Sequence, residues 1–133
     1  MKYEKIWSTT LYTAGTEGYS NFRIPTMITL PSGRVLAFAE ARSEFSDAGE
    51  INIVLRISDD GGRTFCPLKI VAAGNGNTAG NPCPVYDRDT GKILLMFNRN
   101  TAAGHEGLIL QGKAPRTVLL MRSHDLGESW TEI

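Results

Sequence analysis

The feature that most constrains this chain is a short motif that occurs twice. Residues 58–65 and 123–130 share the pattern Ser-x-Asp-x-Gly-x-Thr/Ser-aromatic. In such a motif the aspartate can accept backbone N–H bonds, the glycine supplies an unusual φ angle, and the aromatic ring fills the space between neighbouring sheets. Asp60 and Asp125 are therefore predicted to build turns rather than to act as acids or bases. Two copies in equivalent sequence contexts indicate a repeat architecture.

The segments between the motifs are short, rich in β-branched residues and separated by turn residues at close spacing. Helical periodicity is nearly absent, so the pattern predicts an all-β meander. The apolar run 51–58 is expected to be a strand that is covered on both faces. Residues 75–80 and 100–115 are expected to be long loops. The other expected strands are 22–30, 34–41, 68–73, 85–86, 92–98 and 117–123, with a further strand beginning at 130–133.

Composition excludes several classes of partner. The sequence has 14 Lys+Arg against 14 Asp+Glu, so it offers neither a basic surface for nucleic acid nor a polybasic stretch for an anionic membrane. No window approaches the roughly 18 apolar residues of a membrane-spanning helix. Residues 1–10 have no apolar h-region, so we expect no signal peptide there. The compartment is left unassigned, with the missing leader favouring the cytoplasm.

The two cysteines, Cys66 and Cys83, are not part of a CxxC motif or a Cys/His cluster. We therefore expect no metal site. Both side chains are predicted to be small buried groups, with a single disulfide as the alternative.

The motifs resemble those of a known family. The repeated motif resembles the Asp-box, or BNR repeat, of sialidases (neuraminidases) and other β-propeller glycosidases, and Phe22-Arg23-Ile24-Pro25 resembles the FRIP motif that opens the sialidase catalytic domain. The resemblance runs from about Ser20 to Trp130. The further segments that carry it, in the order in which sialidases have them, are 36–42, 47–54 and 81–87.

The resemblance implies a fold and a function. Residues 1–133 would be the N-terminal part of a six-bladed sialidase propeller, about two blades of it. At roughly 40–50 residues a blade, the length allows about three blades at best, which is too few to close a ring. The parent protein would be an exo-α-sialidase, a glycoside hydrolase that removes terminal sialic acid from sialylated glycoconjugates with retention and without a cofactor. Sialidases use a tyrosine nucleophile. That tyrosine, its glutamate and two arginines of the triad are expected downstream, so this chain alone is expected to be inactive.

Two substrate-site residues follow from the resemblance. Arg23 would be the first arginine of the triad, because a planar guanidinium binds the carboxylate of sialic acid with paired donors. The alternative is an ordinary surface arginine on a strand. Asp47 would be the catalytic acid/base, placed in a polar loop between two apolar strands, and burial under substrate would raise its pKa. Glu44 and Glu50 are rival carboxylates.

Two further residues are assigned to the pocket with alternatives. Arg42 would bind substrate beside the aspartate, or would form a structural salt bridge with Glu40 or Asp47. Glu106 would touch the N-acyl or glycerol side of the sugar, or would be a loop charge next to His105.

Other functions remain open from the sequence. The chain could belong to a catalytically inactive propeller that binds sialic acid or a protein, or to a trans-sialidase. None of Tyr3, Tyr12, Tyr19 and Tyr86 lies in the sequence context of the family nucleophile.

Overall fold

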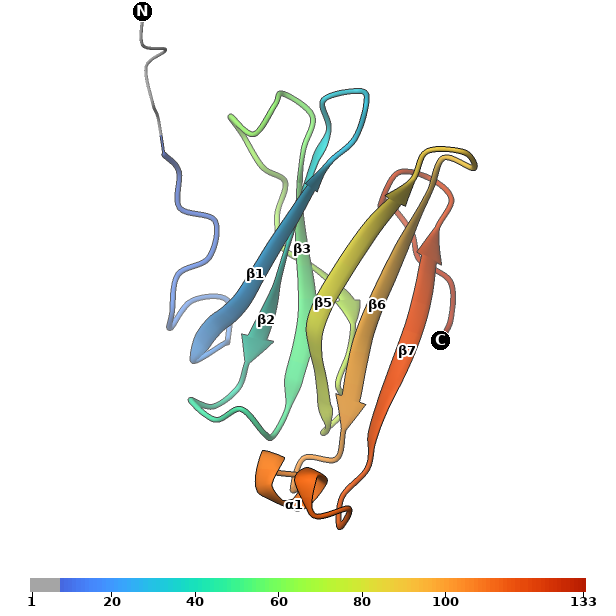
Figure 1. The fold of residues 1–133 in the computed structure, drawn as a ribbon. Helices are drawn as coiled ribbons and strands as arrows, with labels where there is room; N and C mark the ends of the chain where they lie inside the picture. Colours follow the sequence, from blue (N-terminus) through green and yellow to red (C-terminus); the bar gives the residue numbers. More distant parts are fainter. Residues whose placement is uncertain (1–7) are drawn as a thin grey trace, which may run out of the picture.

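The computed structural model describes residues 8–133, so Tyr3 lies outside the described residues. The described chain is almost entirely β-structure, which confirms the predicted all-β class (Figure 1). Among the described residues no helix is long and apolar enough to cross a membrane. The elements are β1 (Asn21–Thr29), β2 (Val35–Arg42), β3 (Ile51–Ser58), β4 (Lys69–Ala72), β5 (Thr78–Asp87), β6 (Lys92–Asn100), α1 (Glu106–Leu110) and β7 (Arg116–Ser123).

The strands form two antiparallel groups. In the first group β1, β2 and β3 pair in order and β4 pairs with the outer side of β3; in the second group β5, β6 and β7 pair in order. The groups are joined by one parallel pairing, Ile51 with Thr78. They lie side by side in Figure 1, the first blue to green and the second yellow to red. This open sheet fits a partial propeller in which each group is one blade.

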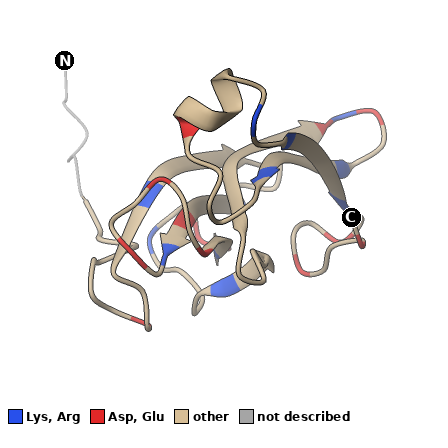
Figure 2. Ribbon diagram, turned by 90° about the horizontal axis from the view of Figure 1, so that it is seen from below, with Lys and Arg blue, Asp and Glu red and all other residues tan. Residues whose placement is uncertain are grey.

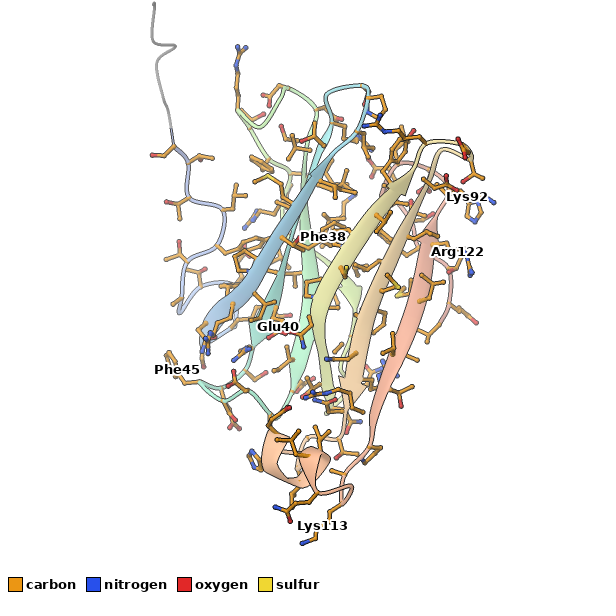
Figure 3. The ribbon with its side chains drawn as sticks, viewed as in Figure 1. Phe38, Glu40, Phe45, Lys92, Lys113 and Arg122 are labelled. Atoms are coloured by element: carbon orange, nitrogen blue, oxygen red, sulfur yellow. The ribbon has the colours of Figure 1, made fainter. Side chains whose placement is uncertain are left out.

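The core lies where the two groups face each other. Every residue of β2 is buried, and so is nearly all of β3, as the uninterrupted apolar run predicts. Phe38, labelled in Figure 3, is fully buried on β2. It packs edge-on against Trp130, with ring centroids 6.0 Å apart. The aromatic residue of the second Asp-box therefore reaches the first blade. The largest fully buried apolar side chains are Phe38, Leu36, Ile51, Ile53, Leu55, Ile93, Leu95 and Val54.

Both Asp-boxes form the predicted turns. Asp60 Oδ1 accepts the backbone N–H groups of Arg63 and Thr64, each at 2.9 Å, and Asp60 Oδ2 accepts the Thr64 hydroxyl. Asp125 accepts the backbone N–H and the hydroxyl of Ser129 in the same way. The turn-building role of both aspartates is confirmed.

The inner strand of each blade carries the same irregularity. The pairing register shifts after Arg23 in β1 and after Gly80 in β5, and in each case a residue with positive φ precedes a proline. These residues are Ile24, with φ 52°, and Asn81, with φ 54°. Proline is tolerated at such bulges because no ladder hydrogen bond is lost there. The prediction of a loop at 75–80 was wrong for 78–80, which form the start of β5. These small residues pair with β6 through the backbone.

Three further local predictions were wrong. The loop 100–115 contains the short helix α1, which its glycine-rich sequence did not indicate. Residues 130–133 do not form a strand, although Thr131 N–H donates to Arg122 O at 2.8 Å. Cys83 is exposed because it lies on the bulged strand, whereas Cys66 is half-buried against the core; both are free.

Candidate active site

A polar cavity lies at the end of the two blades opposite the Asp-box turns, where β2 ends and β5 begins. Its volume is about 370 Å³. Figure 2 views the molecule from this end and shows basic and acidic residues side by side. The charged and amide side chains that line the cavity are Arg23, Glu40, Arg42, Asp47, Asn81, Asn98, Asn100, Glu106 and Arg116.

Asp47 stands between two arginines. Its Oδ1 accepts from Arg42 Nη1 at 2.5 Å and from Arg23 Nη1 at 3.3 Å. The Asp47 side chain is 82% exposed, so its carboxylate is open to a ligand that enters the cavity. The hydrogen bond from Arg42 and the charge of that guanidinium lower the pKa of Asp47 below its ordinary value, with a smaller contribution from Arg23. The carboxylate is therefore ionised at neutral pH in this state.

Arg42 is held from behind by Glu40, two residues earlier on β2. Residues two apart on a strand point to the same face, and Arg42 Nε and Nη2 donate to Glu40 Oε2 at 2.9 and 2.6 Å. Both side chains are almost fully buried. Burial works against the charged form of Arg42, but the hydrogen bonds to Asp47 and Glu40 raise the pKa of its guanidinium. Arg42 thus forms salt bridges with both Glu40 and Asp47 while it lines the cavity.

The second blade also supports Glu40. Asn81 N–H donates to Glu40 Oε1 at 2.8 Å, and a Cβ at Gly80 would lie 2.7 Å from the same oxygen. Gly80 occupies the bulge position in β5 that Arg23 occupies in β1. The missing side chain at Gly80 leaves the space that the buried carboxylate fills.

Glu106 begins α1 and faces the cavity from the second blade. It is held by Arg116, the first residue of β7, through Nη2 to Glu106 Oε2 at 2.6 Å and a longer contact at 3.4 Å. Arg116 Nε also donates to Asn100 Oδ1 at 3.1 Å. Glu106 is therefore tied to the sheet and forms no ion pair with its neighbour His105 among the described residues.

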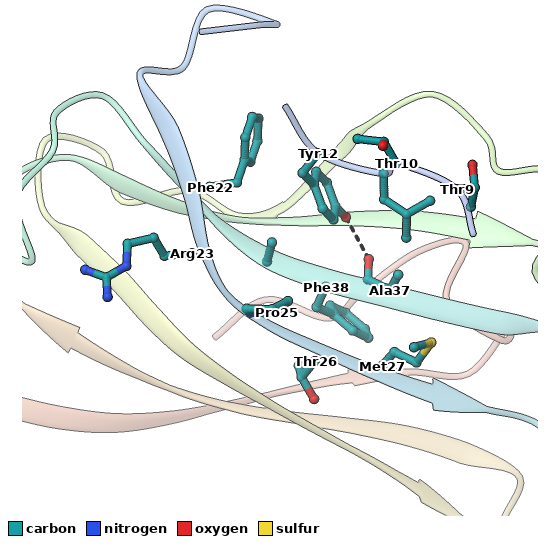
Figure 4. A pocket seen from close by; sticks show the side chains of 12 residues that line it. Thr9, Thr10, Tyr12, Phe22, Arg23, Pro25, Thr26, Met27, Ala37 and Phe38 are labelled. Carbon is teal, nitrogen blue, oxygen red and sulfur yellow. Dashed lines mark hydrogen bonds between the residues drawn. The ribbon is translucent and has the colours of Figure 1, made fainter. Parts of the chain in front are cut away.

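A larger groove of about 640 Å³ lies on the outer face of the first blade. Figure 4 shows Tyr12, Phe22, Phe38 and Met27 around it, with Tyr12 donating to Ala37 O at 2.8 Å. Arg23 touches this groove, but its guanidinium points away from the aromatic side chains toward the other face of β1. The groove is mostly apolar and is lined by no carboxylate or histidine among the described residues, so the polar cavity is the better candidate site.

Comparison with known proteins agrees with this architecture. Residues 33–133 match the family described as BNR repeat-like domain. The chain belongs to this family. Among its relatives, sialidase-3 of Bos taurus is 33% identical over 120 residues, which are 84% of this chain and 28% of that protein. An exo-alpha-sialidase of Aspergillus fumigatus is 31% identical over 134 residues, covering 86% of this chain and 33% of that protein. This BNR-repeat chain thus spans about a third or less of these relatives.

Solved structures give the same result for the fold. A Hadza microbial sialidase, 25% identical, matches 90% of this BNR-repeat chain with a TM-score of 0.77, over 27% of its own chain. An intramolecular trans-sialidase from Ruminococcus gnavus, 22% identical with a TM-score of 0.58, shows likeness of fold alone. The sequence resemblance to sialidases and the partial-propeller fold are confirmed.

The structure of this BNR-repeat domain brings together all four residues that the sequence pointed to. Arg23, Arg42, Asp47 and Glu106 line one cavity, although they come from three separate segments. Sequence reasoning did not assign Glu40, which was named only as a partner of Arg42. The signal that could have marked Glu40 is a charged residue within the otherwise apolar run 36–41. Arg116 carried no local signal, because only the tertiary fold brings it to Glu106.

Proposed function

We propose that this chain is the N-terminal part of an exo-α-sialidase, a glycoside hydrolase that removes terminal sialic acid from glycoconjugates with retention. The observation that carries the proposal is the cluster of Asp47 with Arg23 and Arg42 in one polar cavity. The relatives named as sialidases support the reaction class. The substrate is accordingly a sialylated glycoconjugate.

Each residue has a chemical role in this proposal. Arg23 is half-exposed and offers its guanidinium to the sugar carboxylate, which would then replace the long 3.3 Å contact to Asp47. Asp47 protonates the leaving glycosidic oxygen and later activates water. Its pKa is lowered in the free state by Arg42, so a bound sugar must raise it, by excluding water and by drawing Arg23 away.

The remaining chemistry is assigned to residues outside this chain. Among the described tyrosines, Tyr12, Tyr19 and Tyr86 do not line the cavity. Tyr12 donates to a backbone oxygen, and its burial raises the pKa of the phenol well above the ordinary value. None of the three is suited to attack the anomeric carbon. The nucleophilic tyrosine of the family, its glutamate and two further arginines would complete the site.

The alternative is a propeller that binds sialic acid without cleaving it. Such a module would use Arg23 for the carboxylate but would have no use for a proton donor in the adjoining loop. The exposed carboxylate of Asp47, aimed into the cavity by two arginines, favours the enzyme. A trans-sialidase would share these residues and differ in the acceptor.

The proposal is tested by Asp47→Asn in the full-length gene product. Loss of general acid–base catalysis is expected to lower kcat on a fluorogenic sialoside by roughly 100-fold or more. Glu44→Gln is the matched control, because Glu44 is a carboxylate of the same loop that lies outside the cavity lining. It should retain wild-type turnover.

Three outcomes would contradict the proposal. Unchanged turnover in Asp47→Asn would exclude Asp47 as the acid/base. An equal loss in Glu44→Gln would move the assignment to another carboxylate. Sialic-acid binding by the full-length protein with no turnover would identify a binding module instead. Analysis of the products formed with an added acceptor distinguishes hydrolysis from transfer of sialic acid.

A further inference from the structure

The loop that carries Asp47 belongs to the first blade but is fastened to the second. Gly49, two residues after Asp47, accepts at its carbonyl oxygen from Thr78 Oγ1 at 2.8 Å. The N–H of Gly49 donates to Ala102 O at 3.1 Å. Both backbone groups of one residue are therefore used by the neighbouring blade, at the start of β5 and in the turn after β6.

This attachment coincides with the one pairing of strands between the blades in the described part of the chain, that of β3 with β5. Thr78 is the β5 residue opposite Ile51, and it is 3% exposed. Beside it, Ile51 N–H donates to Asn77 O at 3.1 Å, and Asn77 Oδ1 accepts from Ala102 N–H at 3.2 Å. The loop and the turn after β6 thus share one hydrogen-bonded junction.

The other end of the loop is held by the first blade alone. Ser20 and Asn21 donate from their side chains to the backbone oxygens of Ser43 and Glu44. Between the two ends, the Asp47 side chain contacts Arg23 and Arg42 and is largely exposed. The backbone beside it is held by Arg42 Nη1, which donates to Ser46 O at 3.1 Å, and by Ala48 N–H, which donates to Ser46 Oγ at 3.1 Å. The junction at Gly49 adds the attachment to the second blade and so contributes to the backbone position of Asp47. Gly49 has a φ of 102°, a conformation that favours glycine.

We propose that Thr78 is a positioning residue for Asp47. Its buried hydroxyl holds Gly49 and so sets how far the carboxylate of Asp47 extends into the cavity. Ala102 precedes Glu106 in the connection between β6 and β7. The junction therefore also fixes the position of the Asp47 side of the cavity relative to the Glu106 side. The inference rests on the proposed acid/base role of Asp47 and assigns no substrate contact to Thr78.

The test uses Thr78→Val, which keeps the shape of the side chain and removes the donor. In the full-length protein kcat on a fluorogenic sialoside is expected to fall roughly tenfold to a hundredfold, because a small displacement of a catalytic group is costly. KM should change by less than about threefold, since Arg23 is untouched. Thr78→Ser keeps the hydroxyl and should restore kcat. Thr90→Val is the matched control, because Thr90 also donates through its hydroxyl but lies in the β5–β6 turn.

Hydrogen exchange provides a readout that is independent of activity. Peptides covering 43–50 should exchange faster in Thr78→Val than in wild type and in Thr78→Ser, while peptides from β2 and β3 keep their protection. Wild-type kcat in Thr78→Val would overturn the inference, and so would wild-type exchange of the 43–50 peptides. Loss of protection throughout the sheet would show a general structural role and would also overturn it. If Thr78→Val does not fold, Thr78→Ala provides the same comparison.

The two proposals fail separately. If Asp47→Asn keeps full turnover, the acid/base assignment is wrong whatever Thr78→Val does. If Asp47→Asn is inactive and Thr78→Val retains full kcat, only the positioning role of Thr78 is wrong.

Discussion

At the residue scale, the hydrogen-bond partners of each aspartate indicate its role. Asp47 faces guanidinium groups and a cavity, whereas Asp125 faces the hydroxyl and backbone N–H of Ser129 and the hydroxyl of Ser123. These bonds, that of the Ser129 hydroxyl first, lower the pKa of Asp125 to about 2. They give the Asp125 carboxylate a structural role although it lies at the surface.

The pH dependence of stability should reveal this role. The folded-state pKa of Asp125, about 2, is below the unfolded value of about 3.9. The contribution of Asp125 is therefore fully present above pH ~4 and is lost as the pH falls toward 2. We expect Asp125→Asn to lower Tm at pH 7, and the difference from wild type to shrink as the pH falls, as measured by circular dichroism.

Asp89→Asn serves as the control in the same titration. Asp89 also lies in a turn, but its carboxylate makes no hydrogen bond among the described residues. Its substitution should leave Tm nearly unchanged at every pH. A constant deficit for Asp125→Asn from pH 7 to pH 2 would contradict the role of the carboxylate charge.

At the element scale, the second Asp-box is shaped by its contact with the first blade. Gly127 has a φ of 95°, and a Cβ there would lie 2.5 Å from Leu36 Cδ2. The Leu36 side chain is on β2 and is fully buried. The residue before it, Leu126, also has a positive φ, of 59°, and carries a large exposed side chain. Space, in addition to backbone conformation, therefore requires glycine at Gly127.

The comparison of two glycine substitutions separates these effects. Gly61→Ala introduces backbone strain only, because a Cβ there meets nothing within 4 Å, and should cost about 1 kcal/mol of unfolding free energy. Gly127→Ala adds an overpacked contact and should cost roughly 1–3 kcal/mol more. Chemical denaturation measures both. Equal costs would show that the contact with Leu36 relaxes freely.

At the scale of the whole molecule, the two blades are joined at both ends by different chemistry. At the cavity end, Asn81 N–H of the second blade donates to the buried Glu40 Oε1 of the first, and Thr78 Oγ1 donates to Gly49 O. At the Asp-box end, Arg34 donates to Asp59 of the first box and to Leu126 O and Glu128 of the second. Each end thus ties the blades in the orientation that forms the cavity.

The cavity holds one side of the proposed catalytic site, so the isolated chain should lack sialidase activity. The 133-residue chain on its own is expected to show no turnover of a fluorogenic sialoside, because the nucleophile and two arginines of the proposed mechanism are not among its assigned residues. The full-length gene product in parallel is the positive control. Turnover above background by the isolated chain would mean that a tyrosine of this chain serves as nucleophile.

Local sequence predicted most of the strands but not their exact bounds. The β1–β2 hairpin and β3 followed from apolar runs and from the turn at Gly33, whose φ is 86°. The start of β5 and helix α1 did not follow, because small polar residues and glycines carry little local preference. Cys83 was predicted to be buried, and only the bulge in β5 explains its exposure.

By itself, the sequence determined that the chain is a repeated β-structure of the sialidase type, and it pointed to Arg23, Arg42, Asp47 and Glu106. Motifs can do this because turn geometry and strand pattern are local properties. Only the tertiary structure decided that these residues share one cavity, that Asn81 of the second blade holds Glu40, and that Thr78 holds the Asp47 loop from the second blade. Such contacts join residues far apart along the chain, so they exist only once the blades have packed.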